Sequence, residues 1–265
     1  MKFALVGEQQ RGEAQPDLSG KCPSCGSQMI AKCGEIKIWH WAHLGRRICD
    51  PWWENETEWH RTWKGYFPVE WQERIHIASD GEKHIADVKT DSGVVLEFQH
   101  SHLNPEERRA RNKFYQKLVW VVDGNRRPRY KAQFFKALEE MNPVSSGPTV
   151  RKIFLAWSQL LQEWVDPHAP AFIDFGEESP LWGLIPANPD SMYVHVAAIS
   201  RNEFVDLHLK GTIQEFVEYI RRLQNIVSAD DNRRTQMYHR PVTPLPSHIQ
   251  RQLWRQARAR SLRRF

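Results

Sequence analysis

The chain has 265 residues, of which 40% are apolar and 26% are charged. This composition is typical of a globular protein and excludes a disordered chain, a collagen and a coiled coil. No segment approaches the roughly 20 consecutive apolar residues that a membrane span needs, and the apolar run at the N-terminus is too short for a signal peptide. The sequence therefore predicts a soluble, cytoplasmic protein with no membrane partner.

The net charge of +5 is unevenly distributed. Residues 232–265 contain nine arginines and no lysine or acidic residue, which leaves residues 1–231 at −4. Arg251, Arg255 and Arg258 would share one stripe of a helix, and guanidinium groups suit phosphates. We expect this arginine-rich tail to bind DNA. The alternatives are a disordered end and a docking helix for a protein partner.

All four cysteines lie between residues 22 and 49, which in a cytoplasmic chain of this length favours a metal site over disulfides. Cys22 and Cys25 flank a tight turn, and His40 and His43 follow at a spacing of three. Two thiolates and two imidazoles suit structural Zn²⁺. Residues 1–54 are therefore predicted to form a zinc-binding module. Cys33 and Cys49 compete for the third and fourth ligand positions.

Residues 55–67 are predicted to form a helix that Asn55 caps, with Glu58 in a capping box. Trp59, Trp63 and Tyr66 make an apolar stripe on it. A polar line runs along the same helix at intervals of four residues: Glu56, His60 and Lys64.

Three segments that alternate between apolar and polar residues follow, and each is predicted to be a strand: residues 68–77, 83–90 and 94–100. The loop Asp91-Ser92-Gly93 has the composition of a hairpin turn. A second helix begins at Pro105, which Asn104 precedes as a cap, and a buried strand covers residues 118–122. The order α-β-β-β-α-β indicates a mixed α/β core at residues 55–124.

Residues 125–231 are predicted to be an α+β extension, followed by the tail at 232–265. The helices of the extension are expected at residues 129–141, 151–165 and 212–227. Its strands are expected at residues 171–176, 181–186 and 192–199.

The predicted hairpin brings two acidic residues together. A three-residue loop centred on Ser92 places Asp87 opposite Glu97, with Gln99 on the same face. Opposed side chains have Cβ atoms about 4.5–5.5 Å apart, and two like charges at that distance are destabilising. A divalent cation between the carboxylates removes the conflict, and Mg²⁺ or Mn²⁺ suits such oxygen ligands. The alternative is that one carboxylate pairs with a basic side chain such as Lys89.

Several segments, taken in order, resemble the competence CoiA-like nuclease family: CPSCG, HWAH, ETEWHRTWK, IADVKTDSGVVLEFQHS, PEERRARNKFY and LVWVVDG. That family is similar to the restriction-endonuclease-like, PD-(D/E)XK superfamily. The resemblance covers roughly residues 1–124. It implies an αβββαβ nuclease core and a Mg²⁺- or Mn²⁺-dependent deoxyribonuclease that acts in DNA uptake, in recombination or in defence against foreign DNA.

The resemblance also implies roles for individual residues. Asp87 and Glu97 take the places of the two metal carboxylates, and Gln99 falls where the superfamily has a lysine. Glu56 falls where an acid of the first helix often joins the metal site, and His60 is placed to orient it; the alternative for Glu56 is a solvated helix start. Arg111 and Tyr115 resemble the position of a supporting polar pair on the second helix. With Arg108 they share one helical face, which is expected to contact DNA phosphates; the alternative is that these side chains are simply solvated.

Gln99 departs from the superfamily pattern because an amide carries no positive charge. Either another group supplies the charge (His60, Lys64, Lys89 or His100), or two metals act, or activity is weak. The second hypothesis is a non-catalytic DNA-binding accessory protein whose nuclease site has lapsed.

Overall fold

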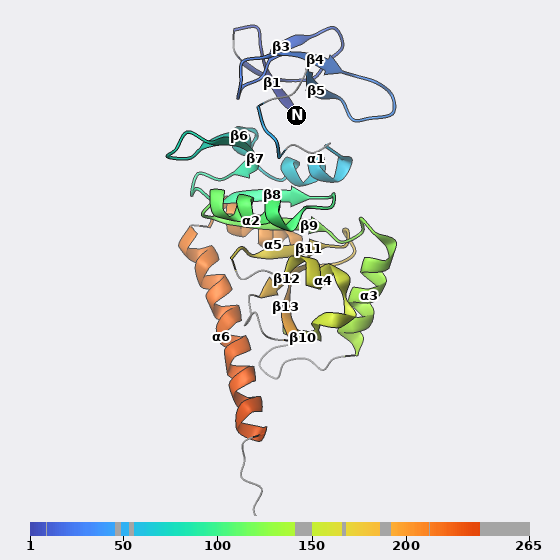
Figure 1. Ribbon diagram of the computed structural model, residues 1–265, viewed down its shortest axis with the longest axis vertical. Helices are drawn as coiled ribbons and strands as arrows, with labels where there is room; N and C mark the ends of the chain where they lie inside the picture. Colours follow the sequence, from blue (N-terminus) through green and yellow to red (C-terminus); the bar gives the residue numbers. More distant parts are fainter. Residues whose placement is uncertain are drawn as a thin grey trace, which may run out of the picture. The chain divides into compact units, whose positions relative to one another are not determined.

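The computed structural model describes residues 1–8, 10–45, 49–52, 56–140, 150–165, 168–185, 192–211 and 213–238. These residues form two β-sheets and six α-helices, which confirms a mixed α/β fold (Figure 1). The chain divides into two units, residues 1–227 and 228–265, and the boundary falls within α6 (Ile213–Tyr238). No helix in the described ranges combines the length and the apolar character needed to cross a bilayer. Arg251, Arg255 and Arg258 lie outside the described residues.

The N-terminal module is a five-stranded antiparallel sheet in the order β2-β1-β3-β4-β5. Its strands are β1 (Phe3–Val6), β2 (Gln10–Glu13), β3 (Ser19–Lys21), β4 (Gln28–Lys32) and β5 (His40–His43). The buried core is small and consists of Met1, Ala4, Ala14, Cys22, Met29 and Trp41. So small a core suits a module that a bound metal helps to fold.

The following segment has the predicted order of elements. It comprises α1 (Glu58–Gly65), a 3₁₀ turn (Val69–Trp71), β6 (Gln72–Ile77), β7 (Lys83–Lys89), β8 (Val95–Gln99), α2 (Pro105–Phe114) and β9 (Leu118–Asp123). Strands β6, β7 and β8 are antiparallel, and β8 pairs with β9 in parallel. Asn104 caps α2 as expected, since its side chain accepts the backbone N–H of Glu106 at 2.8 Å.

The start of α1 differs from the prediction. The cap is Thr57, whose hydroxyl accepts the backbone N–H of His60, while Nδ1 of His60 accepts the backbone N–H of Thr57. This reciprocal pair is a capping box with histidine as the third helical residue. Asn55, the predicted cap, lies outside the described residues.

The extension continues the same sheet instead of forming a separate one. Its elements are α3 (Pro128–Glu139), β10 (Val150–Phe154), a 3₁₀ turn (Leu155–Trp157), α4 (Gln159–Trp164), β11 (Ala171–Asp174), β12 (Leu181–Ile185), β13 (Tyr193–Ile199) and α5 (Arg201–Leu209). Strand β11 pairs with β9 in parallel, so one sheet of eight strands runs in the order β10-β13-β12-β11-β9-β8-β7-β6. The predicted helix at residues 151–165 is wrong at its start, because residues 150–154 form β10.

Helices cover both faces of this sheet, as alternate residues of β9 show. Val119 and Val121 pack in a cluster with Trp63 of α1 and Phe204 of α5. Trp120 and Val122 pack in a second cluster with α2, α3 and α4, which lie in front of the sheet in Figure 1. Glu97 and Gln99 of the hairpin are buried, whereas the Asp87 side chain is 25% exposed.

Candidate functional site: two clusters of metal-ligand residues

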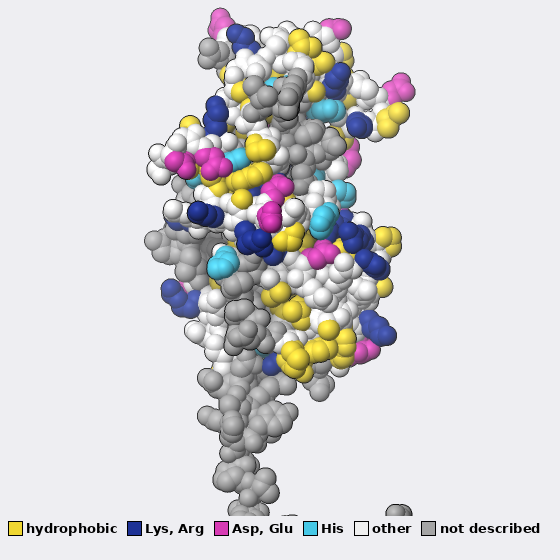
Figure 2. All heavy atoms as spheres, viewed as in Figure 1, with side chains coloured by type: hydrophobic (Ala, Val, Ile, Leu, Met, Phe, Trp, Pro, Cys, Tyr) yellow, Lys and Arg dark blue, Asp and Glu magenta, His cyan; other side chains and the backbone are white. Residues whose placement is uncertain are grey.

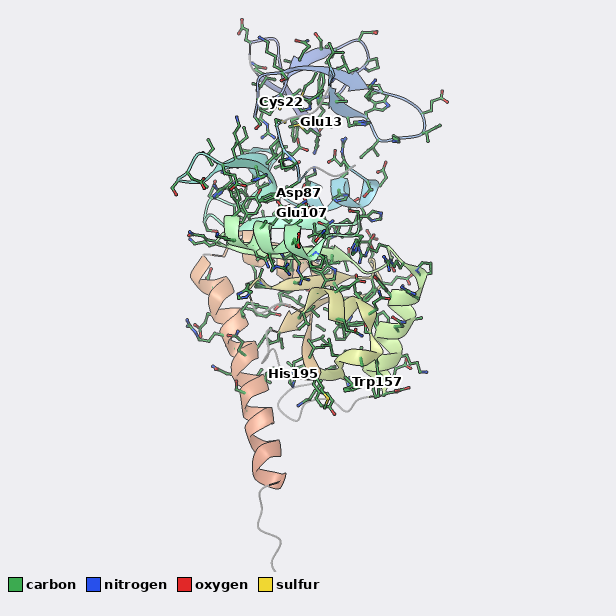
Figure 3. All side chains as sticks on the ribbon, in the orientation of Figure 1. Glu13, Cys22, Asp87, Glu107, Trp157 and His195 are labelled. Carbon is green, nitrogen blue, oxygen red and sulfur yellow. The ribbon has the colours of Figure 1, made fainter. Side chains whose placement is uncertain are left out.

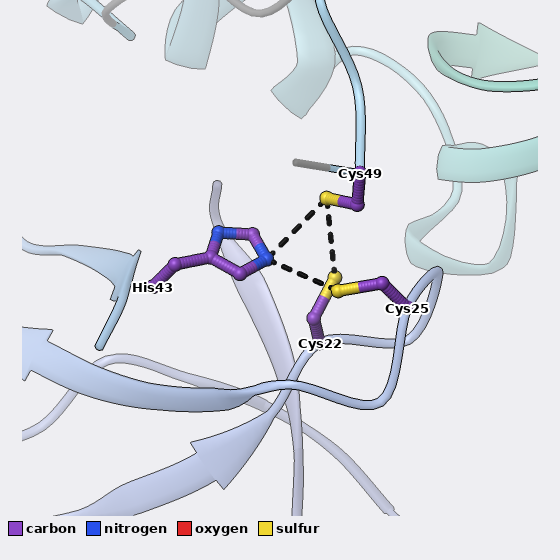
Figure 4. Close-up of side chains that lie close together, drawn as sticks. All are labelled: Cys22, Cys25, His43 and Cys49. Carbon is purple, nitrogen blue, oxygen red and sulfur yellow. Dashed lines mark hydrogen bonds between the residues drawn. The ribbon is translucent and has the colours of Figure 1, made fainter. Parts of the chain in front are cut away.

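The first candidate site is a group of three thiols and one imidazole in the N-terminal module: Cys22, Cys25, His43 and Cys49 (Figure 4). The ligand atoms lie within 4.8 Å of one another. Sγ of Cys22 is 3.8 Å from Sγ of Cys49, and Nε2 of His43 is 3.4 Å from Cys25 and 3.3 Å from Cys49. Tetrahedral zinc with bonds of about 2.3 Å to sulfur and about 2.0–2.1 Å to nitrogen separates its ligand atoms by about 3.6–3.8 Å. The donor set and its spacing therefore fit Zn²⁺.

A tight turn presents the first two thiols. The backbone N–H of Gly26 donates to the carbonyl of Cys22, that of Cys22 donates to the carbonyl of Ser27, and Gly26 adopts a φ of +71°. Burial opposes ionisation of Cys25, but hydrogen bonds with Ser27 and His43 lower the pKa of this thiol to about 6. A thiolate near neutral pH is the form that binds a metal.

The prediction that His40 is a ligand is corrected, because Cys49 occupies its place. His40 and His43 both belong to β5, where residues three apart point to opposite sides. Nδ1 of His40 instead lies 2.9 Å from the carbonyl oxygen of Ile38. Cys33 packs against the module's core and is not part of the group. Side chains alternate between the two faces of a strand, and this alternation could have excluded His40 as a ligand alongside His43.

The second candidate site is the pair of carboxylates on the β7–β8 hairpin. Val88 pairs with Leu96 and Lys89 with Val95, which is the predicted register. At the next position, bonds to the carboxylates take the place of backbone hydrogen bonds between the two strands. The backbone N–H of Asp87 donates to Glu97 Oε1 at 3.3 Å, and that of Phe98 donates to Asp87 Oδ2 at 3.0 Å. Asp87 and Glu97 are thus neighbours at the point where the two strands separate.

Both carboxylates line a cavity of about 70 Å³. Its other polar lining comes from α1 and the residues just before it, from α2 and its C-terminal cap, from β6 and β8, and from the segment that follows the N-terminal sheet. These residues are Asp50, Glu56, His60, Lys64, Glu73, Gln99, Arg111 and Tyr115. Figure 3 places Asp87 between the N-terminal sheet, which carries Cys22, and α2, which carries Glu107.

A buried ammonium group compensates the acids on one side of this cavity. Nζ of Lys64 is 2.5 Å from Oε1 of Glu56, 3.1 Å from Oε1 of Glu73 and 3.8 Å from Oδ1 of Asp87. Burial alone would lower the pKa of Lys64, but Glu73 and Glu56 raise it above its ordinary value. The same attraction outweighs burial at Glu73 and lowers the pKa of that carboxyl to about 2. Lys64 therefore remains charged.

Arg111 compensates the other side. Its Nη1 donates to Oε2 of Glu97 at 2.9 Å, and both side chains are buried. Burial and the neighbouring Asp87 nevertheless raise the pKa of Glu97 to about 8. Ionisation of Glu97 beside Asp87 is therefore unfavourable without a further positive charge, which a divalent cation bound between the two carboxylates would supply.

Glu56 and His60 lie at the cavity but in other roles than expected. The carboxylate of Glu56 pairs with Lys64 and, at 3.0 Å, with Arg61. His60 caps α1 through its Nδ1. Among the described residues, only the cysteine–histidine group gathers three or more ligand atoms within 4.8 Å of one another. Asp87 and Glu97 are thus not joined by a third side chain in such a group, although Asp50, Glu56 and Glu73 line the same cavity.

The predicted DNA contacts of Arg111 and Tyr115 on α2 are corrected, because both side chains are buried. Arg111 is 4% exposed and Tyr115 is 2% exposed. The guanidinium of Arg108 donates to the backbone carbonyl of Glu163 and lies 5.5 Å from the ring centroid of Trp164. Arg111 and Tyr115 are therefore out of reach of a polyanion, whereas Arg108 is partly exposed and lines a surface pocket.

Basic residues do line an open groove of about 770 Å³ beside the cavity. Lys113 and Lys117 are exposed there, and Lys89 donates to Nδ1 of His76 at 2.9 Å. Asp80 and Glu82 line the part of the groove at the β6–β7 turn. Figure 2 shows basic side chains over α2.

Glu73 and Asp50 are cavity residues that sequence analysis missed. Glu73 adopts a φ of +47°, a conformation that non-glycine residues rarely take, and alternation along the strand gives no sign of it. Lys64 could have been identified as a cavity residue from the sequence, since it belongs to the polar line along the first helix.

A comparison with known protein families gives a match in the N-terminal module. Residues 19–51 match the family Competence protein CoiA, N-terminal domain. The matched stretch contains Cys22, Cys25, His43 and Cys49. No curated protein and no solved structure matches the chain.

Proposed function

We propose that this chain is a metal-dependent DNA nuclease related to competence protein CoiA, with a restriction-endonuclease-like core of the PD-(D/E)XK type. The observation that carries the proposal is the convergence of Asp87, Glu97 and the buried Lys64 on one cavity. The family match at residues 19–51 supports a competence-related role. Hydrolysis of DNA phosphodiester bonds by this chain would act in DNA uptake or in defence against foreign DNA.

In this proposal, Asp87 and Glu97 hold one Mg²⁺ or Mn²⁺ ion, with water completing its coordination. Such an ion, when bound, lowers the pKa of a coordinated water and offsets charge on the reacting phosphate. Gln99 is buried and lines the same cavity, where its amide can orient a water. It cannot supply the positive charge of the lysine that it replaces.

Lys64 is the group that we assign to this missing charge. It is held 3.8 Å from Oδ1 of Asp87, and Glu56 and Glu73 fix its ammonium from the other side. A preorganised cation in a water-poor site stabilises a developing negative charge more strongly than it would in water. The role of Glu56 is then to position Lys64.

DNA is the proposed partner, and the groove with Lys89, Lys113 and Lys117 is its proposed path to the cavity. The groove and the cavity share Trp52 and Tyr115 in their linings, so they adjoin. Lysines in such a groove would neutralise phosphates without reading sequence.

A non-catalytic DNA-binding role is the second candidate, and Gln99 is the observation that favours it. Nε2 of Gln99 is 3.3 Å from the backbone oxygen of Ser101, and an amide engaged in this way suits a structural residue. The pairing of Asp87 with the buried Glu97 argues for the nuclease, because a lapsed site has no need of two adjacent acids.

A cleavage assay separates the two candidates. Zinc-loaded protein is incubated with plasmid and with labelled single- and double-stranded oligonucleotides, with Mg²⁺, Mn²⁺ or EDTA. We expect metal-dependent cutting that Asp87→Asn and Glu97→Gln abolish. Asp91→Asn is the matched control, since this acid of the same hairpin is 76% exposed. Cutting that persists in Asp87→Asn would place the site elsewhere, and DNA binding without cutting by the wild type would favour the accessory role.

A further inference from the structure

Residues 49–52 join the two candidate sites directly. Cys49 belongs to the cysteine–histidine group, whereas Asp50 and Trp52 line the cavity of Asp87 and Glu97. Only a few residues of chain therefore separate a proposed zinc ligand from the surroundings of the proposed catalytic ion.

Asp50 connects this segment to β7. It is 6% exposed, and its Oδ2 accepts the backbone N–H of Ile85 at 3.0 Å, two residues before Asp87. Its Oδ1 lies 3.0 Å from Nδ1 of His84. The ring of His84 stacks on Trp52 with centroids 3.3 Å apart. The segment and the strand that presents Asp87 are thus held as one unit.

Arg111 connects the same segment to Glu97. One arm of its guanidinium, Nη2, donates to the backbone oxygen of Trp52 at 2.7 Å. The other arm, Nη1, donates to Oε2 of Glu97 at 2.9 Å. A shift of Trp52 would therefore be transmitted to Glu97 through a rigid, planar group.

A second connection runs through Glu73. Its carboxylate accepts the backbone N–H groups of Lys2 and Phe3 of the N-terminal module at 2.7 and 3.0 Å, and Oε1 also binds Lys64. The module thus contacts the cavity from two sides.

We propose that zinc in the cysteine–histidine group tightens binding of the divalent ion at Asp87 and Glu97, with Asp50 and Arg111 as positioning residues. This inference rests on the proposed nuclease function. The physical reason is that a zinc–thiolate bond at Cys49 restrains one end of the segment, whose other contacts then hold both carboxylates in place. Groups that orient metal ligands in this way typically change metal affinity about 10- to 100-fold when removed.

The test measures Mn²⁺ affinity by electron paramagnetic resonance of free Mn²⁺, with zinc content and urea stability measured on the same samples. Thiolates favour zinc over Mn²⁺, so Mn²⁺ reports on the oxygen site. We expect Cys49→Ser to lose zinc and to bind Mn²⁺ at least about 10-fold more weakly. Cys33→Ser is the matched control, because this cysteine of the same module lies outside the group.

Asp50→Asn tests the connection without touching a zinc ligand, and it decides the matter if Cys49→Ser does not fold. It should keep its zinc and still bind Mn²⁺ more weakly. Loss of one negative charge would also weaken Mn²⁺ binding, so Asp50→Asn is compared in the wild-type and Cys49→Ser backgrounds, or in zinc-stripped protein. A positional effect shrinks without zinc, whereas an electrostatic effect persists.

Unchanged Mn²⁺ affinity in folded, zinc-free Cys49→Ser, or in Asp50→Asn, would overturn the coupling. Failure of the zinc-loaded wild type to bind Mn²⁺ would instead overturn the proposed nuclease site.

Discussion

Lys64→Met is expected to be the most destabilising single change at the cavity. The Lys64 side chain is 4% exposed, and its ammonium lies 2.5 Å from Glu56 and 3.1 Å from Glu73. Methionine fills a similar volume but leaves Glu73 without its cation and Glu56 with Arg61 alone. Breaking a buried ion pair by removing one partner costs about 3–5 kcal/mol. For a unit of this size that corresponds to a fall in Tm of roughly 10 °C.

Urea unfolding followed by tryptophan fluorescence measures this loss. Lys136→Met is the matched control, because this lysine is 77% exposed and pairs with Glu140 at 3.9 Å on the surface of α3. It should change stability by no more than about 0.5 kcal/mol. A loss below about 1 kcal/mol in Lys64→Met, the value for an exposed pair, would refute the assignment of Lys64 as a buried compensating charge.

A double-mutant cycle with Glu73→Gln identifies the partner. If the two side chains interact as the 3.1 Å contact indicates, the double variant should be less destabilised than the two single variants added together. The expected coupling energy is about 0.5–3 kcal/mol. Additive effects would mean that Glu73 is stabilised by its bonds to Lys2 and Phe3 and not by Lys64.

Three further outcomes are expected. Burial lowers the pKa of His208 to about 4, so the unfolded chain binds a proton before the folded chain does as the pH falls. The neutral His208 therefore contributes up to about 3 kcal/mol of stability that is fully present above the unfolded pKa near 6.5 and is lost towards pH 4. His208→Leu should remove that part of the pH dependence of urea unfolding. Cys25→Ser should lose bound zinc, as measured by elemental analysis, and equal zinc content in variant and wild type would contradict the ligand set. Lys117→Glu should weaken DNA binding and reduce the slope of log K against log salt by at least about 0.7–0.9. Deletion of residues 248–265 should reduce that slope further if the tail contacts DNA, and should leave it unchanged if the tail binds a protein.

The parts of the structure that follow from local sequence were predictable. The hairpin at residues 83–99 has alternating residues on both sides of a turn with glycine, and its register alone places Asp87 beside Glu97. The N-terminus of α2 has a cap, a proline and acidic residues within four positions. In both cases the relevant interactions join residues that are close in the chain, so the sequence pattern contains them.

Contacts between distant residues account for most of the errors. Residues 150–154 precede a helical pattern, but they pair with β13, 39 to 47 residues away, and this pairing overrides local preference. The left-handed backbone of Glu73 is stabilised by bonds to Lys2 and Phe3, about 70 residues away. The helix α5 was also absent from the predicted elements, but here the signal was local. The Ser200 hydroxyl caps the helix by accepting the backbone N–H of Glu203, and this capping signal was present in the sequence.

The extension also determines how the cavity is built. Oδ2 of Asp174, at the end of β11, accepts the indole N–H groups of Trp59 and Trp63 at 2.9 Å each, and Oδ1 accepts Arg201 at 2.6 Å. These indoles orient α1, and α1 also carries Lys64, which lines the cavity. Because β11 also pairs with β9, removing the extension would expose an edge of the central sheet and release the helix that holds the compensating charge. The hairpin acids and the extension are therefore parts of one folded unit, although only the first half of the chain contains the acids themselves.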